Sequence, residues 1–220
     1  MKGSDTFERE RETRETATRV LLELLSGDSR VLDIGCGRGE LLEHLGPGDF
    51  NMGVDIDRDA VIDCISRGLN VIMLDATGGL RCFGDDSFDT AVLNRTLEVL
   101  TRPDLVLREM LRVARRAICF VPNFGHWRVR LQLLGGFMPK TAALPYEWYD
   151  TPNIHHTTLR DFVKLVGISG GHIQRVYAVS GGRLRRRLPL PNMTAEWGCF
   201  VISRADEPAC AGRKIQAAGL

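Results

Sequence analysis

Three alternating glycines directly follow a short apolar run. Residues 31–34 read Val-Leu-Asp-Ile, and residues 35–39 read Gly-Cys-Gly-Arg-Gly. Glycine accepts positive φ angles and lets a ligand approach bare main chain. Apolar residues resume at 41–45 and predict the start of a helix. In an open α/β sheet a nucleoside-type ligand binds beyond the carboxyl end of the first strand, so this loop predicts a nucleoside site.

The order of the glycines argues against a nucleotide held by its phosphates. A dinucleotide loop reads G-x-G-x-x-G and holds a pyrophosphate on the helix N-terminus, whereas here Glu40 takes the place of the third glycine. Its carboxylate would compete with a phosphate for the positive end of the helix dipole. The Gly-Lys-Ser/Thr of a P-loop does not follow either. A nucleoside without phosphates and with a positive centre fits better, and S-adenosylmethionine (SAM) is such a ligand.

Acidic and amide side chains follow the next expected strands. Asp55 comes about 20 residues after the first glycine, the spacing at which a carboxylate meets the ribose hydroxyls. Asp75 ends another apolar run, either as a contact to the ligand or as a plain loop residue. Asn94 ends the strand after that, at the sheet edge where the methyl donor would point. Asp57, in contrast, is expected to cap a helix.

The elements that must position these residues alternate between strand and helix. Such alternation predicts an α/β fold with a doubly wound, mostly parallel sheet. The helix from Thr101 is expected to start with a Thr-x-x-Asp capping box and to have Arg115 and Arg116 at its negative end. Phe88 is expected to fill the core and Asp89 to tie a turn. The expected strands are residues 31–34, 50–55, 71–76, 90–93, 117–121, 173–179 and 196–203, and the expected helices include 7–25, 57–68, 101–113, 129–134 and 158–166.

Length and composition favour a single domain. The 220 residues carry a formal net charge of +1, which favours neither nucleic acid nor an anionic membrane as a partner. We expect one domain over residues 1–204 and a disordered tail over 205–220. A charged, polar beginning and the lack of a long apolar run indicate a cytoplasmic protein without a membrane span. The six cysteines form no Cys-x-x-Cys pair, so we expect free buried thiols and no metal site.

Aromatic residues gather in an insertion after the fifth expected strand, at 122–156. Together with His, Asn and Glu side chains they suggest a lid or a recognition surface. The alternative is that they only pack a helix onto the sheet edge. The one basic run, Arg183–Arg187, is expected to be a solvated loop or a dock for an acidic partner.

Two resemblances sharpen this interpretation. The glycine loop resembles motif I of the class I SAM-dependent methyltransferases. Residues 30–203 as a whole resemble the MetW family of methionine biosynthesis, most distinctively at PNFGHWRVRLQLL (122–134) and LPYEWYDTPNIH (144–155), and more loosely at PNMTAEWGCFVI (191–202). The family loop commonly reads GCGDG, and Arg38 stands here in place of its aspartate.

The resemblance implies a Rossmann-like fold with seven strands in the order 3-2-1-4-5-7-6, the last one antiparallel. It also implies SAM or S-adenosylhomocysteine (SAH) as the ligand, with Asp75 accepting from the adenine amino group. The cofactor-binding residues expected on this basis are Asp33, Gly35, Cys36, Gly37, Gly39, Asp55, Ile56, Asp75, Ala76 and Asn94.

The family further implies a partnership with homoserine O-acyltransferase, whose activity can depend on it. The chain would then be an accessory subunit, and no pattern of residues identifies a catalytic base. Methyl transfer needs mainly alignment of nucleophile and sulfonium, so a free-standing small-molecule methyltransferase is the alternative, with Asn94, His155 or His156 in its substrate pocket. A third hypothesis is an interaction module whose cofactor cleft is vestigial. Trp127, Arg128, Tyr146, Trp148 and Tyr149 are the expected partner surface.

Overall fold

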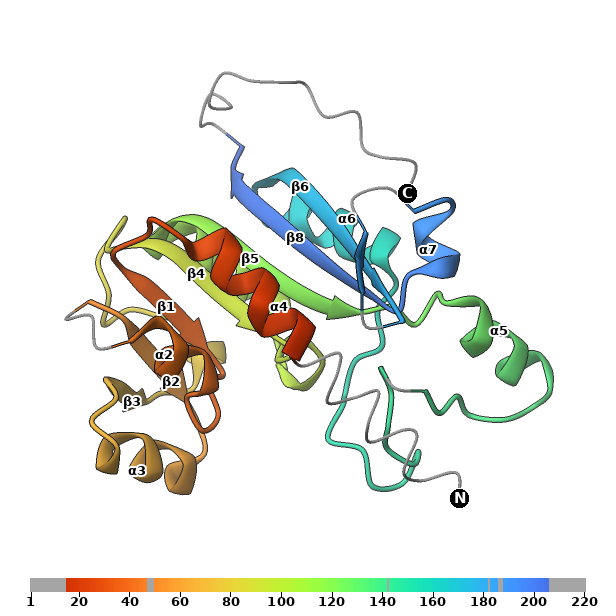
Figure 1. The fold of residues 1–220 in the computed structure, drawn as a ribbon, viewed down its shortest axis with the longest axis horizontal. Coiled ribbons are helices and arrows are strands. Elements are labelled where there is room, and N and C mark those ends of the chain that lie inside the picture. The colour runs from red at the N-terminus through yellow and green to blue at the C-terminus, as the bar shows by residue number, and fades with distance from the viewer. Residues whose placement is uncertain (1–14, 47–49, 142, 182, 186–187, 206–220) are drawn as a thin grey trace.

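The computed structural model describes residues 15–46, 50–141, 143–181, 183–185 and 188–205. These residues contain one eight-stranded sheet in the order β3-β2-β1-β4-β5-β8-β6-β7 (Figure 1). The first five strands of that order pair in parallel, and the last three pair antiparallel. The strands are β1 (Val31–Ile34), β2 (Met52–Asp55), β3 (Val71–Met73), β4 (Phe88–Asn94), β5 (Ala114–Pro122), β6 (Gly171–Ser180), β7 (Arg183–Arg185) and β8 (Trp197–Arg204).

Helices lie on both faces of the sheet, as the doubly wound prediction requires. The helix over residues 15–25 and α2 pack on one face, and α4 and α6 pack on the other. The helices are α2 (Glu40–Leu45), α3 (Arg58–Ser66), α4 (Pro103–Val113), α5 (Trp127–Leu134), α6 (Leu159–Ile168) and α7 (Pro191–Thr194), with 3-10 helices η1 (Ala76–Gly78) and η2 (Leu97–Val99). None of the helices in the described part of the chain is long and apolar enough to cross a membrane.

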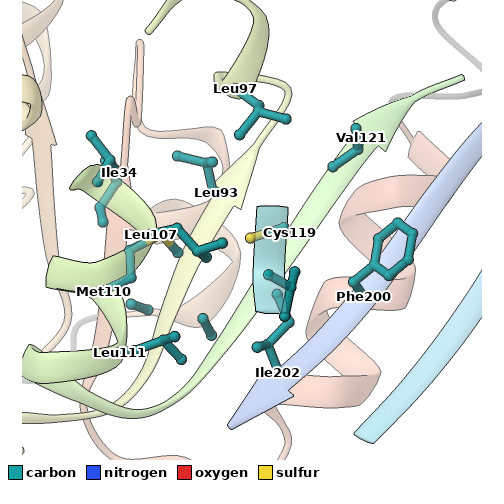
Figure 2. Close-up of a cluster of buried hydrophobic side chains, with 14 of the residues drawn as sticks. Ile34, Leu93, Leu97, Leu107, Met110, Leu111, Cys119, Val121, Phe200 and Ile202 are labelled. Carbon is teal, nitrogen blue, oxygen red and sulfur yellow. The ribbon is translucent and has the colours of Figure 1, made fainter. Parts of the chain in front are cut away.

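The middle stretches of the central strands, residues 91–93 in β4 and 117–121 in β5, are apolar because both faces of the sheet are covered there. Along β5, Ile118 and Phe120 face the helix over residues 15–25, while Cys119 and Val121 face α4 and α6. The same alternation in β4 places Leu93 against α4. Figure 2 shows this second layer, in which α4 contributes Leu107, Met110 and Leu111.

The prediction of seven strands is wrong, because Arg183–Arg185 forms an eighth strand at the edge. It pairs antiparallel with β6 after a turn at Gly181, whose φ is +58°. Leu184 packs on the core, while Arg183 and Arg185 are exposed. An Arg-Leu-Arg alternation is suited to a sheet edge, where a charge discourages pairing with another chain. The predicted solvated loop is therefore a strand as far as Arg185, and residues 186–187 lie outside the described residues.

The helix predicted for 101–113 does end at Val113, but its predicted capping box and the predicted role of Arg115 and Arg116 at its end are wrong. Its N-cap is Arg102, without a side-chain cap, and Asp104 pairs with Arg102 at 2.9 Å instead of completing a capping box with Thr101. Arg115 and Arg116 belong to β5, and Arg116 forms an ion pair with Asp28 at 2.7 Å.

Thr158, the first residue of the expected helix 158–166, caps α6 by accepting from Asp161 N. Two local predictions are confirmed. Asp89 ties the turn before β1 by accepting from the main chain of Ser29 and from Arg30, at 3.0–3.1 Å. Phe88 is buried against Phe83, with ring centroids 5.1 Å apart. The predicted tail, from residue 206 on, and the first residues of the predicted first helix, before residue 15, lie outside the described residues.

Between β5 and α6 the alternation of strands and helices stops. The carboxyl end of β5 leads to α5, which Figure 1 shows beyond the sheet rather than against either face. Residues 135–158 contain no further helix or strand in their described part, apart from a bridge between Thr141 and Leu144. The end of the insertion is joined to η2, because Glu98 O accepts hydrogen bonds from Ile154 N and His155 N at 2.9 and 3.0 Å.

Candidate functional site

The glycine loop wraps tightly around the end of β1. Gly35 N and Cys36 N both donate to Val54 O on the neighbouring β2, at 2.8 and 3.1 Å. Gly35, Gly37 and Gly39 have φ of +71°, +52° and +76°. A Cβ on Gly35 would lie 2.3 Å from Thr96 Cγ2. This loop therefore requires glycine for its backbone angles, and at Gly35 for space as well.

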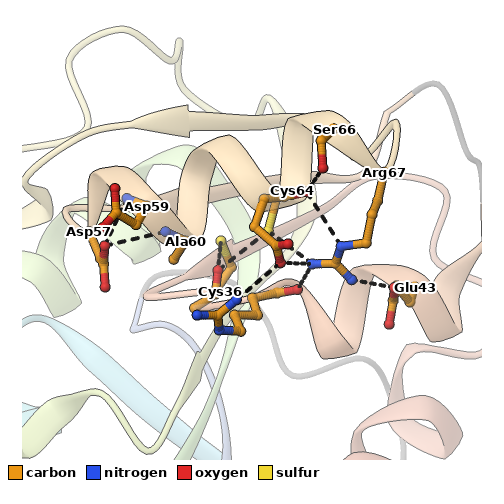
Figure 3. Close-up of polar contacts among 11 residues, drawn as sticks. Cys36, Glu43, Asp57, Asp59, Ala60, Cys64, Ser66 and Arg67 are labelled. Carbon is orange, nitrogen blue, oxygen red and sulfur yellow. Dashed lines mark hydrogen bonds and ion pairs between the residues drawn. The ribbon is translucent and has the colours of Figure 1, made fainter.

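Asp55, at the end of β2, holds the loop in place. Its Oδ2 accepts from Gly37 N at 2.7 Å and its Oδ1 accepts from Asp57 N at 2.9 Å. Asp57 in turn caps α3, as predicted, by accepting from Asp59 N and Ala60 N (Figure 3). The same carboxylate that was expected to meet a ribose thus fixes the glycine turn beside it.

Arg38 turns its charge toward α3. Its guanidinium lies 3.6 Å from Asp63 Oδ2, and its side chain is 72% exposed. Arg67, at the end of α3, donates to Arg38 O and also binds Asp63 and Glu43, which links α3 to the loop and to α2 (Figure 3). The carboxylate of Asp63 thus partly compensates the positive charge that Arg38 adds to this loop.

A cavity of about 400 Å³ opens between the glycine loop and the insertion. Its floor is formed by the loop and the end of β4, and residues 143–153 of the insertion contribute Ala143, Pro145 and Tyr146 to its wall. The complete lining is Thr18, Asp33, Gly35, Cys36, Gly37, Arg38, Glu40, Leu41, Asn94, Arg95, Glu98, Val99, Pro122, Ala143, Pro145, Tyr146, Pro152, Asn153 and Trp197.

Four buried polar atoms in this lining have no hydrogen-bond partner. Among the described residues the side-chain atoms in this condition are Asp33 Oδ1, Asn94 Oδ1, Glu98 Oε1 and Trp197 Nε1, and all four residues line the same cavity. Native proteins satisfy nearly all buried polar groups, because an unsatisfied one costs about 1–3 kcal/mol. Such a cluster indicates that this cavity is built to bind a polar ligand.

Two of the four are carboxylic acids with strongly shifted pKa values. Burial, and then repulsion from Asp55, raises the pKa of Asp33 to about 7. Burial also raises the pKa of Glu98 to about 7, although Arg95 acts in the opposite direction. Burial and the neighbouring Asp33 and Asp55 raise the pKa of the Cys36 thiol, which makes it a poor nucleophile. Shifted acids in a cavity are typical of functional sites.

The structure brings only half of the predicted residues into the cavity. Asp33, Gly35, Cys36, Gly37 and Asn94 line it. Gly39 caps α2, and Asp75 caps η1 by accepting from Thr77, whose hydrogen bonds lower the pKa of the Asp75 carboxyl. The predicted residues outside the cavity lining are Gly39, Asp55, Ile56, Asp75 and Ala76.

Sequence reasoning missed Arg95, Glu98 and Trp197. Glu98 could have been found from the sequence, because it is the one acid within the apolar stretch from Leu97 to Leu100. In the structure it is only 4% exposed. Trp197 belongs to β8, almost a hundred residues after Glu98 in the chain, and no local sequence pattern indicates its place in the site. Arg95, at φ +59°, places its guanidinium over the Trp197 ring, 5.2 Å from the centroid.

A second cavity, of about 420 Å³, is lined by residues of the insertion, both aromatic and polar. Phe137, Met138 and Trp148 line it, and Tyr146 and Asn153 line both cavities. His156 faces this second cavity, where it stacks on Phe124, and burial lowers its pKa. Of the side chains expected in a substrate pocket, only Asn94 therefore reaches the cavity at the glycine loop, and His155 lines neither one.

Solved structures identify the fold. A SAM-dependent methyltransferase of Thermotoga maritima, described as a possible histamine N-methyltransferase, superposes with a TM-score of 0.66 at 15% identity and covers 91% of this chain and 93% of its own. The magnesium protoporphyrin IX methyltransferase of Synechocystis, solved with bound SAH, gives 0.62 at 17% identity and covers 93% and 95%. The chain has the class I SAM-dependent methyltransferase fold, with an additional edge strand.

Sequence comparison identifies the family. A bifunctional methionine biosynthesis protein, MetXA/MetW, of Rhodopirellula baltica is 36% identical over 159 residues. That match covers 67% of this chain but only 26% of the relative, so this chain spans about a quarter of the relative's length. The model of the family described as "Methionine biosynthesis protein MetW" matches residues 15–202. The chain belongs to the MetW family of methionine biosynthesis proteins.

Proposed function

We propose that this protein is an accessory subunit that supports a homoserine O-acyltransferase and binds SAM or SAH in its glycine-loop cavity. The observation that carries the first half is the bifunctional relative, whose name joins MetXA and MetW in one chain. Two proteins that are fused in one chain in one organism are suited to bind each other as separate chains in another organism. A cytoplasmic location remains a prediction from the sequence.

The residues at the loop fit the aminoacyl end of SAM. The unpartnered Asp33 Oδ1 offers an acceptor for an ammonium group, and an ammonium ligand would lower the raised pKa of Asp33. A Cβ at Gly37 would meet no protein atom within 4 Å, so the main chain there is open to a ligand. Asp55, which its two backbone donors already orient, is the proposed ribose acceptor. Bound SAM would supply an electrophilic methyl group, and the chain's own contribution is to bind and orient it.

The exposed side chains of the insertion support the proposed partner surface. Trp148 and Tyr149 are 69% and 71% exposed, and Trp127 and Tyr146 are 42% and 45% exposed. The alternative, that Trp127 and Trp148 are core residues, does not agree with this exposure. Arg128 lies over the Trp127 ring at 5.4 Å. Trp, Tyr and Arg are the side chains that most often dominate the binding energy of interfaces.

A free-standing methyltransferase is the second candidate, and one feature favours it. The cavity continues past the glycine loop to Glu98 and Trp197, which leaves room for a methyl acceptor beside the cofactor.

Calorimetry tests the ligand half of the proposal. We expect SAH to bind, and we expect Asp55→Ala to weaken it by about 1.5–3 kcal/mol, as for the loss of a hydrogen bond to a charged acceptor. Asp59→Ala removes an exposed carboxylate four residues away and should leave affinity unchanged. Absence of heat with both SAM and SAH would make the cleft vestigial, and Arg38→Asp would then show whether Arg38 is the cause. Co-purification with the homoserine O-acyltransferase tests the partner half independently.

A further inference from the structure

The four unpartnered buried atoms come from four different elements, and only Asp33 belongs to the strand that leads into the glycine loop. Asn94 ends β4, Glu98 belongs to η2, and Trp197 begins β8. Their side chains line the same cavity as Val99, Pro122, Pro145 and Pro152. Together the three side chains offer two oxygen acceptors and one N–H donor, and no group of the described residues satisfies these three atoms.

The main chain of Glu98 joins η2 to the insertion. Its carbonyl oxygen accepts from Ile154 N and His155 N, so the insertion is fastened to the residue whose side chain faces the cavity. The carboxyl group has a charge environment of its own. The charge that acts on Glu98 is Arg95, whereas the charge that acts on Asp33 is Asp55. The cavity therefore holds two buried acids with different charged neighbours, and Glu98 is the one whose main chain is joined to the insertion.

We propose that Asn94, Glu98 and Trp197 form a second-ligand subsite for a small compound that carries a primary ammonium group and an oxygen acceptor, such as an amino acid or an amino alcohol. An ammonium group donates to the oxygens of Asn94 and Glu98, and the Trp197 indole donates to the ligand's oxygen. A buried carboxylate prefers an ammonium over a neutral donor because the pair gains a charge-assisted hydrogen bond. The subsite rests on the proposed function only in assigning the residues at the glycine loop to SAM or SAH.

The Trp197 indole N–H offers a direct readout. The chain has three tryptophans, and Trp197→Phe assigns its indole resonance in a spectrum of ¹⁵N-labelled protein. Ethanolamine is the probe, and ethylene glycol, which has a hydroxyl in place of the ammonium, is the matched control. We expect a saturable shift of the Trp197 resonance with ethanolamine and none with ethylene glycol. A shift of equal size with both compounds, or with neither, would overturn the subsite.

Variants tie the effect to Glu98. Glu98→Gln should weaken ethanolamine at least about ten-fold, equivalent to ~1.4 kcal/mol. Glu147→Gln, which changes a half-exposed carboxylate of the insertion, should leave it unchanged. If Glu98→Gln melts early, Asn94→Ala provides the second test, with the same expected loss. Unchanged affinity in a folded Glu98→Gln protein would contradict the proposal.

Titrations with SAH distinguish a failure of the proposed subsite from a failure of the proposed function. Saturating SAH should change ethanolamine affinity by less than about three-fold, and Glu98→Gln should leave SAH affinity intact. Competition between the two, together with loss of SAH binding in Glu98→Gln, would assign Glu98 to the cofactor and refute the second ligand. Failure of SAH to bind at all would refute the proposed cofactor, while the ethanolamine titration would still decide the subsite.

Discussion

Asp33 and Glu98 are buried acids that the folded chain leaves without a hydrogen-bond partner at one oxygen each. Their protonated forms are favoured because burial disfavours the charge, and the pKa of each rises to about 7. The folded state therefore holds protons that the unfolded chain has already released. The site is maintained at a cost in stability, which is typical where function rather than packing selects a residue.

The Glu98 shift predicts a pH dependence of the free energy of unfolding. A raised folded-state pKa contributes stability that is fully present below the unfolded value of 4.5 and is lost as the pH rises to about 7. The slope for one such group is about 1.4 kcal/mol per pH unit between those values. Glu98→Gln should remove that slope and stabilise the protein at pH 8, measured by urea unfolding from pH 4.5 to 8. Glu147→Gln is the control, and parallel curves for the wild type and Glu98→Gln would contradict the assignment.

Gly37 allows backbone strain to be separated from ligand binding. Gly37→Ala and Gly170→Ala both place a side chain at positive φ, +52° and +79°, and neither Cβ meets an atom within 4 Å. Each should cost about 1–2 kcal/mol of stability. Only Gly37 lines the cavity, so only Gly37→Ala should also weaken SAH, measured by calorimetry at matched fraction folded. Equal SAH affinity in both variants would remove the loop from the ligand site.

At the scale of elements, the sequence predicts what local patterns encode. The parallel core, the glycine turn and the cap at Asp57 follow from short-range signals, and the structure agrees. The capping box at Thr101 was wrong because the Arg102–Asp104 pair uses the same carboxylate. Trp197 could not be foreseen, since β8 brings it to the site through the antiparallel pairing of β5 with β8. The part of the site to which Trp197 belongs is made by tertiary contacts alone.

At the insertion, we predict that exposed side chains bind the acyltransferase. Arg128→Ala and Trp148→Ala remove exposed side chains, so both variants should keep the wild-type melting temperature and lose capture of the acyltransferase. Ile65→Ala, an exposed apolar residue on α3, is the control and should retain capture. Folded insertion variants that still bind and activate the partner would move the interface elsewhere.

At the scale of the whole molecule, the ligand cavity and the insertion occupy the same edge of the sheet. The glycine loop and the end of β4 form the floor of the cavity, and Tyr146 and Asn153 line both this cavity and the second one at the insertion. A partner docked on the insertion would therefore contact the segment that encloses the ligand. The proposed ligand site and the proposed partner surface therefore lie in one region of the molecule. The bifunctional relative is about four times as long as the segment that matches this chain.

The most direct measurement is the rate of acyl transfer to homoserine by the purified acyltransferase, alone and with an equimolar amount of this protein. We expect a marked increase in rate that saturates near an equimolar ratio. Arg128→Ala should abolish this increase and Ile65→Ala should preserve it. An acyltransferase that is fully active alone, unaffected by this protein and not bound by it, would contradict the central claim.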